Sequence, residues 1–204
     1  MKPYQWIVGT LITGVLLGWG LYQLLLPNGR QATVSQPPRG GDFSLTSPSG
    51  PFHLKDHRGK VVLIYFGYTF CPDICPTNLA LLSQALSEMS QAELARVQGV
   101  FISVDPERDT LDKLSSYANY FHRAILGMTG TPEAVARVAA QYGAAYHRVE
   151  GESRGGYLVD HSSNTYVVAP DGSLSVTLNH ASPPQEILAA VRRLLGPGQP
   201  TNPN

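Results

Sequence analysis

The sequence is poor in charge and in cysteine, and both deficits exclude classes of protein. Charged residues make up 15% of the 204 residues, and 15 basic residues balance 15 acidic ones. A net charge of zero gives no electrostatic basis for binding nucleic acid, so we expect no such partner. Two cysteines are too few for a disulfide-rich scaffold or a four-cysteine zinc site. Internal repeats and low-complexity stretches are also missing from the sequence.

A long uncharged run lies near the N-terminus, from Trp6 to Leu26. As a helix, these 21 residues would be about 31 Å long, close to the roughly 30 Å hydrocarbon core of a bilayer. A cleaved signal peptide would have a shorter apolar stretch, about 7–15 residues, and a small-residue cleavage site after it. The run instead ends in Leu-Leu-Leu-Pro-Asn. We therefore expect an uncleaved transmembrane helix over residues 6–26, preceded by a short tail of residues 1–5.

The rest of the sequence divides into a linker, one folded domain and a tail. Residues 27–41 are rich in proline, glycine and polar residues, which is typical of a flexible tether. Residues 42–195 carry enough apolar residues for one domain of ordinary size. Residues 196–204 (GPGQPTNPN) have the composition of a disordered tail.

Strand and helix patterns alternate along residues 42–195. The run Val61–Phe66 is apolar throughout, which is typical of a strand buried on both faces. The other expected elements are a hairpin around Ser49-Gly50, strands at 100–104, 164–169 and 174–178, and helices from Pro76 and over 110–121, 131–142 and 186–195. This order predicts a three-layer α/β fold. The cysteines then lie at the carboxyl end of the sheet, where ligand sites usually collect.

Cys71 and Cys75 form a C-x3-C motif at the start of a predicted helix, and three interpretations of it are open. A structural disulfide would close a loop of only five residues, for which chain entropy gives about 2 kcal/mol. A redox dithiol would gain from the helix N-terminus, which favours a thiolate. A metal site would offer two soft ligands, which select copper(I) over magnesium, calcium or manganese. Asp73, between the cysteines, is expected to cap the helix.

A metal site needs at least one ligand more, and histidines are the natural candidates. His161 follows a short apolar run and precedes the strand expected at 164–169, so its loop can approach Cys71 across the sheet. Spacing alone does not establish this, because a lone histidine is more often a polar surface or core residue. The acidic segment Asp105–Asp109 offers carboxylates, which bind copper(I) poorly, and we expect it to form a turn, a helix cap and local ion pairs.

Four motifs, in this order, resemble the Sco/SenC family. They are YFGYTFCPDICP at residues 65–76, FISVDPERDT at 101–110, GMTGT at 127–131 and VDHS at 159–162. The resemblance covers about residues 41–195. One departure is Met128, where the family pattern has leucine, and we expect it to be a packing change only.

The resemblance implies a thioredoxin-like fold in a membrane-tethered copper chaperone of cytochrome c oxidase assembly. One copper ion, Cu(I) or Cu(II), would be bound by Cys71, Cys75 and His161, carried over by position. Asp160 would either orient the His161 ring or be a plain strand-end residue. The implied location is the inner (cytoplasmic) membrane, with a single span and the domain on the periplasmic side. The implied partner is cytochrome c oxidase subunit II, with other copper chaperones or thiol reductants as further partners.

An alternative function belongs to another class of protein. A thiol–disulfide oxidoreductase would keep the oxidase subunit's cysteines reduced for metallation, with Cys71 as the catalytic nucleophile and Cys75 as the resolving thiol. Such an enzyme has no use for His161, which separates the two hypotheses. A peroxidase is a weaker candidate, because it needs an arginine beside its thiolate and the motif around Cys71 contains none.

Overall fold

The structure, a computed structural model, describes residues 38–150 and 156–196 together with Gly18 and Tyr22. The expected tail at 1–5, nearly all of the expected transmembrane segment 6–26, most of the linker 27–41 and nearly all of the tail 196–204 lie outside these residues. Within the described part, no helix has the length and apolar character to cross a membrane. The residues from Pro38 onward form one compact unit.

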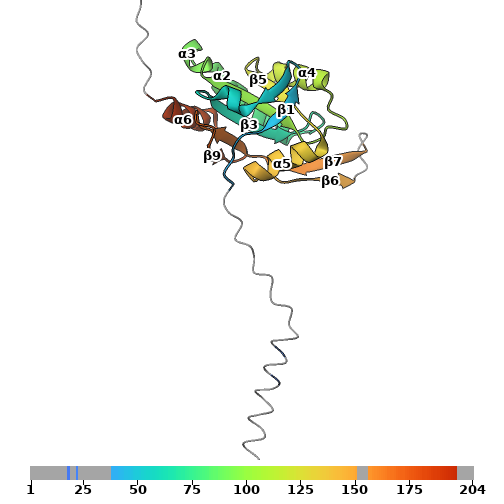
Figure 1. Ribbon diagram of the computed structural model, residues 1–204. Helices are drawn as coiled ribbons and strands as arrows, with labels where there is room; N and C mark the ends of the chain where they lie inside the picture. The colour runs from blue at the N-terminus through green and yellow to red at the C-terminus, as the bar shows by residue number, and fades with distance from the viewer. Residues whose placement is uncertain (1–17, 19–21, 23–37, 151–155, 197–204) are drawn as a thin grey trace, which may run out of the picture. The chain divides into compact units, whose positions relative to one another are not determined.

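A five-stranded sheet is the centre of this unit (Figure 1), with the strand order β5-β4-β3-β8-β9. In that order the strands span Ile125–Met128, Val97–Ser103, Val61–Gly67, Thr165–Val168 and Leu174–Leu178. The β3–β4 and β4–β5 pairs are parallel, whereas β8 runs antiparallel to both β3 and β9. All seven residues of β3 are buried, as the apolar run predicts for a central strand.

Alternate side chains of β3 point into different cores, because successive residues of a strand face opposite sides of the sheet. Val61, Leu63 and Tyr65 pack in one core with three helices. These helices are α2 (Ile74–Ser87), α4 (Leu111–Phe121) and α6 (Pro184–Leu195). α2 begins at Ile74, two residues before the expected start, which places Cys75 inside the first turn.

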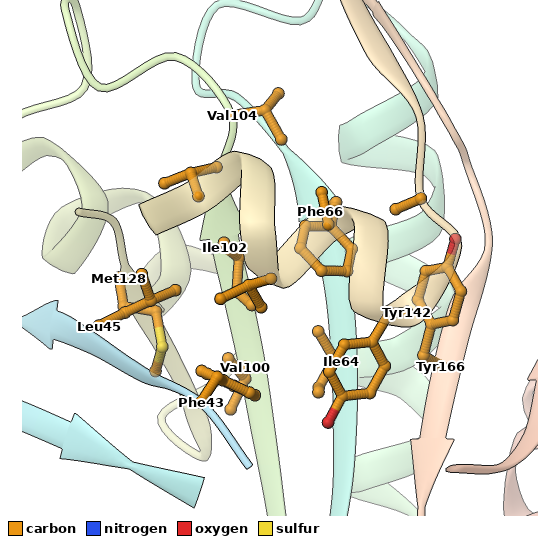
Figure 2. Packing of buried hydrophobic residues seen from close by; sticks show 14 of the residues in the cluster. Phe43, Leu45, Ile64, Phe66, Val100, Ile102, Val104, Met128, Tyr142 and Tyr166 are labelled. Atoms are coloured by element: carbon orange, nitrogen blue, oxygen red, sulfur yellow. The ribbon is translucent and has the colours of Figure 1, made fainter. Parts of the chain in front are cut away.

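The opposite face of β3 presents Val62, Ile64 and Phe66 to the second core. Figure 2 shows Ile64 and Phe66 in this core beside two tyrosines, Tyr142 and Tyr166. Its cover consists of α5 (Pro132–Tyr142) and the hairpin of β1 (Ser44–Ser47) and β2 (Gly50–His53). Helices therefore flank the sheet on both faces, and the predicted three-layer α/β architecture is confirmed. Met128 is fully buried here, as expected for a core residue.

Three short elements complete the unit. They are the 3-10 helix η1 (Leu54–His57), the helix α3 (Gln91–Leu94) and a second hairpin, made of β6 (Tyr146–Glu150) and β7 (Tyr157–His161). The sequence pattern does not predict this hairpin. Among the residues that the structure describes, its two strands form a separate sheet that shares no ladder with the central one. His161 was expected in a loop, but it is the last residue of strand β7.

Candidate metal centre

The turn between β3 and α2 carries both cysteines. Cys71 is half-buried and Cys75 is fully buried, and both sulfurs are free. β3 ends at Gly67, where a Cβ atom would lie only 2.5 Å from the Cys75 sulfur. Glycine at this position therefore makes room for the sulfur behind the turn.

His161 meets both sulfurs from the end of β7. Its Nε2 lies 3.2 Å from the Sγ of Cys75 and 3.7 Å from the Sγ of Cys71. The three donor atoms all lie within 4.8 Å of one another. Across the described residues, this is the only such group of three His, Cys, Asp or Glu side chains. The structure thus brings together the three residues that the family resemblance assigns as ligands.

The helix N-terminus acts on Cys71 directly. The backbone N–H of Cys75 donates a hydrogen bond to the Cys71 sulfur at 3.4 Å. Asp73 holds the N-cap position, but its side chain accepts no backbone N–H, so the capping role expected for it is wrong. The reason is that the Cys71 sulfur already accepts the N–H that a capping side chain would take.

The two thiols differ strongly in acidity. Hydrogen bonds from the Cys75 side chain, from His161 and from the backbone N–H groups of Cys75 and Asp73 lower the pKa of Cys71 to about 4, against the opposing effect of burial. Burial raises the pKa of Cys75, and its hydrogen bond to Cys71 and the charge of that thiolate raise it further. The pair therefore holds one thiolate and one thiol, which share a proton through their hydrogen bond.

Two aromatic rings fix the orientation of the imidazole. Tyr65 and Tyr68 both make edge-on contacts with His161, with ring centroids 6.2 and 5.8 Å away. The Nδ1 atom lies 3.1 Å from the carbonyl oxygen of Ser162. This contact lies on the side of the ring away from the sulfurs and helps to hold Nε2 toward them.

The side chain of Asp160 pairs with His147 rather than with His161. Its carboxylate lies 3.5 Å from Nε2 of His147, and both side chains are largely exposed. These two residues face each other across the β6–β7 pair. This placement favours the interpretation of Asp160 as a strand-end residue over a role in orienting the His161 ring.

A cleft of about 520 Å³ opens over the site. Cys71 and His161 line it together with apolar side chains that include Tyr68, Ile74 and Leu158. Cys75 is not part of its lining, since that sulfur lies behind the other two groups. A partner can therefore reach the site from the side of Cys71 and His161.

Asn78 is a buried polar residue near the site that sequence reasoning missed. Its side-chain amide lies 3.1 Å from the Tyr65 hydroxyl, 2.8 Å from the Ser163 carbonyl and 3.0 Å from Nδ1 of His180. Its side-chain oxygen accepts the N–H of Ala181 at 2.9 Å. The signal that could have found it is a polar residue on the buried face of α2, between Cys75 and Leu79.

Comparison with known proteins assigns the family. The SCO1/SenC family model matches residues 31–196. The chain belongs to the SCO1/SenC family. The bovine mitochondrial protein SCO2 homolog is 41% identical over 166 residues, a match that covers 80% of this chain and 61% of that protein. The chain therefore spans less than two thirds of the length of the mammalian SCO2 homologs that it matches.

Solved structures of SCO1/SenC proteins share the fold. The solution structure of apo Sco1 from Thermus thermophilus is 40% identical, with a TM-score of 0.70, and the match covers 78% of this chain and 94% of that one. ScoI from Bradyrhizobium japonicum, solved with copper bound, is 37% identical with a TM-score of 0.69, covering 76% of this chain and 99% of that one. The thioredoxin-like α/β fold implied by the four motifs is thereby confirmed.

Proposed function

We propose that this protein is a membrane-anchored copper chaperone. It binds one copper ion through Cys71, Cys75 and His161 and delivers it to the binuclear copper centre of cytochrome c oxidase subunit II. The observation that carries the proposal is the convergence of the three donor atoms within 4.8 Å, from elements far apart in the sequence. The copper bound by the Bradyrhizobium relative supports it.

The chemistry of the donor set fits copper as cargo. Two thiolates and a neutral imidazole carry a charge of −2, so the site would be −1 with Cu(I) and neutral with Cu(II). Thiolates are soft ligands that suit Cu(I), whereas structural zinc takes four protein ligands. A three-ligand site stays accessible to an incoming thiolate from a partner. This openness suits transfer by ligand exchange, with the partner entering through the cleft beside Cys71.

The different acidities of the cysteines order the proton movements. Cys71, whose pKa is lowered to about 4, is ready to bind a metal ion as a thiolate. Cys75, whose pKa is raised, has to give up its proton on loading and takes one back on release. His161 contributes Nε2 as the third ligand atom.

The proposed placement is outside the cytoplasm, on the inner membrane. Residues 6–26 would form the single span after the tail 1–5, residues 27–41 the tether, and residues 42–195 the copper-binding domain on the periplasmic side, followed by the tail 196–204. The supporting observation is the uncharged run from Trp6 to Leu26.

A thiol–disulfide oxidoreductase is the second candidate function. The observation that favours it is a half-buried Cys71 with a pKa lowered to about 4, backed by a buried second thiol. These are the properties of a nucleophilic thiolate and its resolving partner. His161 distinguishes the functions, because only copper binding uses it as a ligand.

Transfer to the oxidase subunit tests the main proposal. The Cu(I)-loaded protein is mixed under anaerobic conditions with the reduced, copper-free domain of subunit II, and copper is measured on both after separation. We expect transfer by the wild type and none by His161→Ala or Cys75→Ser. If His161→Ala supports oxidase assembly fully in cells while Cys75→Ser does not, the oxidoreductase function is favoured instead.

A further inference from the structure

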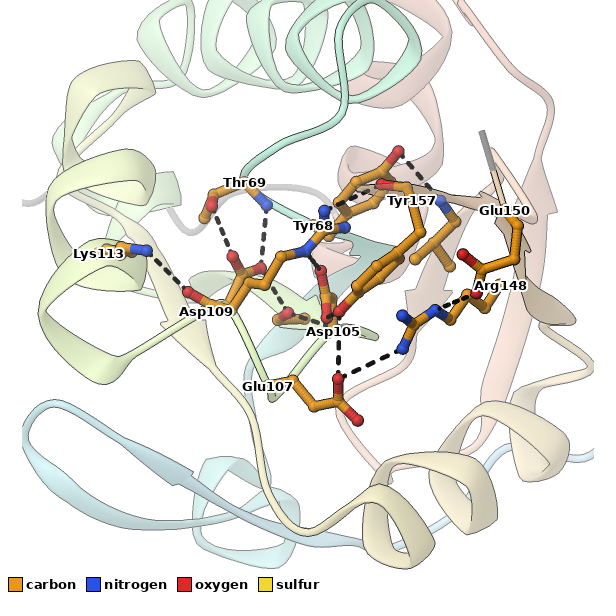
Figure 3. Close-up of polar contacts among 12 residues, drawn as sticks. Tyr68, Thr69, Asp105, Glu107, Asp109, Lys113, Arg148, Glu150 and Tyr157 are labelled. Carbon is orange, nitrogen blue, oxygen red and sulfur yellow. Dashed lines mark hydrogen bonds and ion pairs between the residues drawn. The ribbon is translucent and has the colours of Figure 1, made fainter. Parts of the chain in front are cut away.

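The segment Asp105–Asp109, between β4 and α4, contacts both parts of the metal centre (Figure 3). One part is the turn after β3, residues 68–71, called here the cysteine turn. The other is β7, which ends in His161. We propose that this segment is a brace that sets the position of His161 relative to the two cysteines, with Arg108 as the residue that joins both parts. The inference rests on the proposed copper site.

The first contact of the brace is with the cysteine turn. Asp109 is 1% exposed and accepts hydrogen bonds from the backbone N–H and the hydroxyl of Thr69, at 2.9 and 2.5 Å. It also accepts one from the hydroxyl of Ser103, at the end of β4, at 2.6 Å. Thr69 lies two residues before Cys71. The buried Asp109 side chain therefore fixes the turn just before the first ligand through two hydrogen bonds to Thr69.

The second contact is with β7. Asp105 is 3% exposed and accepts a hydrogen bond of 2.7 Å from the hydroxyl of Tyr157, the first residue of β7. The same carboxylate forms an ion pair with Arg108. Tyr157 lies four residues before His161 on the same strand. Its side chain therefore fixes the strand that carries the third ligand.

Arg108 contacts both parts at once. Its guanidinium donates a hydrogen bond of 2.9 Å to the Tyr157 carbonyl and lies 3.6 Å from the centroid of the Tyr157 ring. It also lies 5.2 Å from the ring of Phe70 and 5.7 Å from that of Tyr68, both in the cysteine turn. A planar guanidinium can stack on aromatic rings while its N–H groups donate hydrogen bonds. A lysine ammonium is a point charge and lacks this planar set of donors.

Side-chain contacts are needed here because of the sheet topology. Within residues 38–150 and 156–196, β7 pairs with β6 in a two-stranded sheet apart from the central one, whereas the cysteine turn follows the central strand β3. In the described part of the chain, the ladder nearest His161 on the central sheet begins only at Thr165 of β8, which pairs with Tyr65 of β3. The brace supplies a connection between the two parts, as does the Tyr68 hydroxyl, which accepts the N–H of Val159 in β7 at 3.2 Å.

The test uses two variants of the full chain, Arg108→Lys and Tyr157→Phe, each made in wild type and in His161→Ala. The control is Arg192→Lys, which changes an exposed arginine of α6 that pairs with Glu93. The Cu(I) affinity is measured by competition with bathocuproine disulfonate, the Cu(II)–thiolate absorption band is recorded, and the thermal midpoint of the apo protein checks folding.

We expect both brace variants to weaken Cu(I) binding about tenfold and to shift the absorption band, as outer contacts of a metal site commonly do. Arg192→Lys should change neither. In the His161→Ala background, the brace variants should cause no additional loss of Cu(I) affinity, because the histidine ligand that the brace positions is absent. Tyr157→Phe keeps the aromatic ring and removes only the hydroxyl that bonds to Asp105. It therefore tests the brace even if Arg108→Lys does not fold.

Two results overturn the brace while the proposed function survives. One is weakened copper binding in His161→Ala with wild-type affinity in both brace variants. The other is an equal loss of Cu(I) affinity by the brace variants in wild type and in His161→Ala, which would show a general effect on the fold. Wild-type affinity in His161→Ala would overturn both the brace and the copper site.

Discussion

The side-chain amide of Asn78 donates a hydrogen bond of 2.8 Å to the carbonyl of Ser163, two residues after His161. It thereby ties the helix that carries Cys75 to the segment that follows the third candidate ligand. Asn78 is only 6% exposed, and its amide also donates a hydrogen bond to the hydroxyl of the fully buried Tyr65.

We expect Asn78→Ala to lower the free energy of unfolding by about 2 kcal/mol, since it removes a hydrogen-bond partner of the buried Tyr65 hydroxyl. Urea denaturation followed by circular dichroism measures the change. The matched control is Asn119→Ala on the exposed face of α4, where the amide reaches only the Ser115 hydroxyl, at 3.4 Å. Equal losses in the two variants would contradict the role given to Asn78.

Gly67→Ala should disturb the metal centre by displacing the Cys75 sulfur. The new Cβ would lie 2.5 Å from the Cys75 sulfur and 2.9 Å from the Phe101 ring. We expect an overpacking cost of about 1–3 kcal/mol and weaker copper binding, because the sulfur has to move. In the control Gly99→Ala, the Cβ would crowd Ile125 at 3.0 Å instead. That variant should lose stability and keep its copper affinity; equal copper affinities in the two variants would refute the explanation.

The lowered pKa of Cys71 predicts an unusual pH dependence of its reactivity. A thiol whose pKa is about 4 stays a thiolate above that pH, so the apo protein should react with iodoacetamide at nearly constant rate from pH 8 to pH 5. The rate should fall only as the pH approaches 4. Cys71→Ser should react slowly throughout, since Cys75 is buried and its pKa is raised.

The same measurement in urea supplies the control for that prediction. Unfolding removes the hydrogen bonds that stabilise the thiolate, so the rate should then fall about tenfold per pH unit below the pKa of an ordinary thiol, about 8.5. If the folded protein shows this ordinary dependence, the thiolate assigned to Cys71 is wrong.

The proposed orientation of the chain in the membrane can be tested with reporter fusions. An alkaline phosphatase reporter fused after Asn204 should be active, because we place the domain outside the cytoplasm, where this enzyme folds with its disulfides. Deleting residues 1–26 should move the protein from the membrane fraction to the soluble fraction. A fusion active only with a cytoplasmic reporter would exclude the proposed placement.

Much of the central sheet could be predicted from the sequence, whereas the β6–β7 hairpin could not. Val61–Phe66 is an unbroken apolar run, and such a run identifies a buried strand by itself. Tyr146–Glu150 has no buried residue and no apolar alternation, so its strand conformation depends on pairing with β7. Propensity alone does not resolve a strand of this kind.

The candidate site was predictable in its residues but not in its geometry. The motif order suggested His161, yet 86 residues separate it from Cys75 in the sequence. The approach of the two depends on packing between β7 and the cysteine turn, which local pattern does not encode. Asp105 and Asp109 show the same limit, since their sequence predicted a turn and ion pairs but not the tertiary hydrogen bonds to Tyr157 and Thr69.

Copper stoichiometry after anaerobic loading of the full chain, in wild type and in His161→Ala, tests the central claim most directly. His122→Ala is the control, because His122 lies at the end of α4 and its Nδ1 accepts a backbone N–H from Ala124. We predict one copper ion per chain, with a thiolate-to-copper(II) absorption band, in the wild type and the control. His161→Ala should lose most of its copper on gel filtration against a chelator. Unchanged retention and an unchanged spectrum in His161→Ala would contradict the three-ligand site.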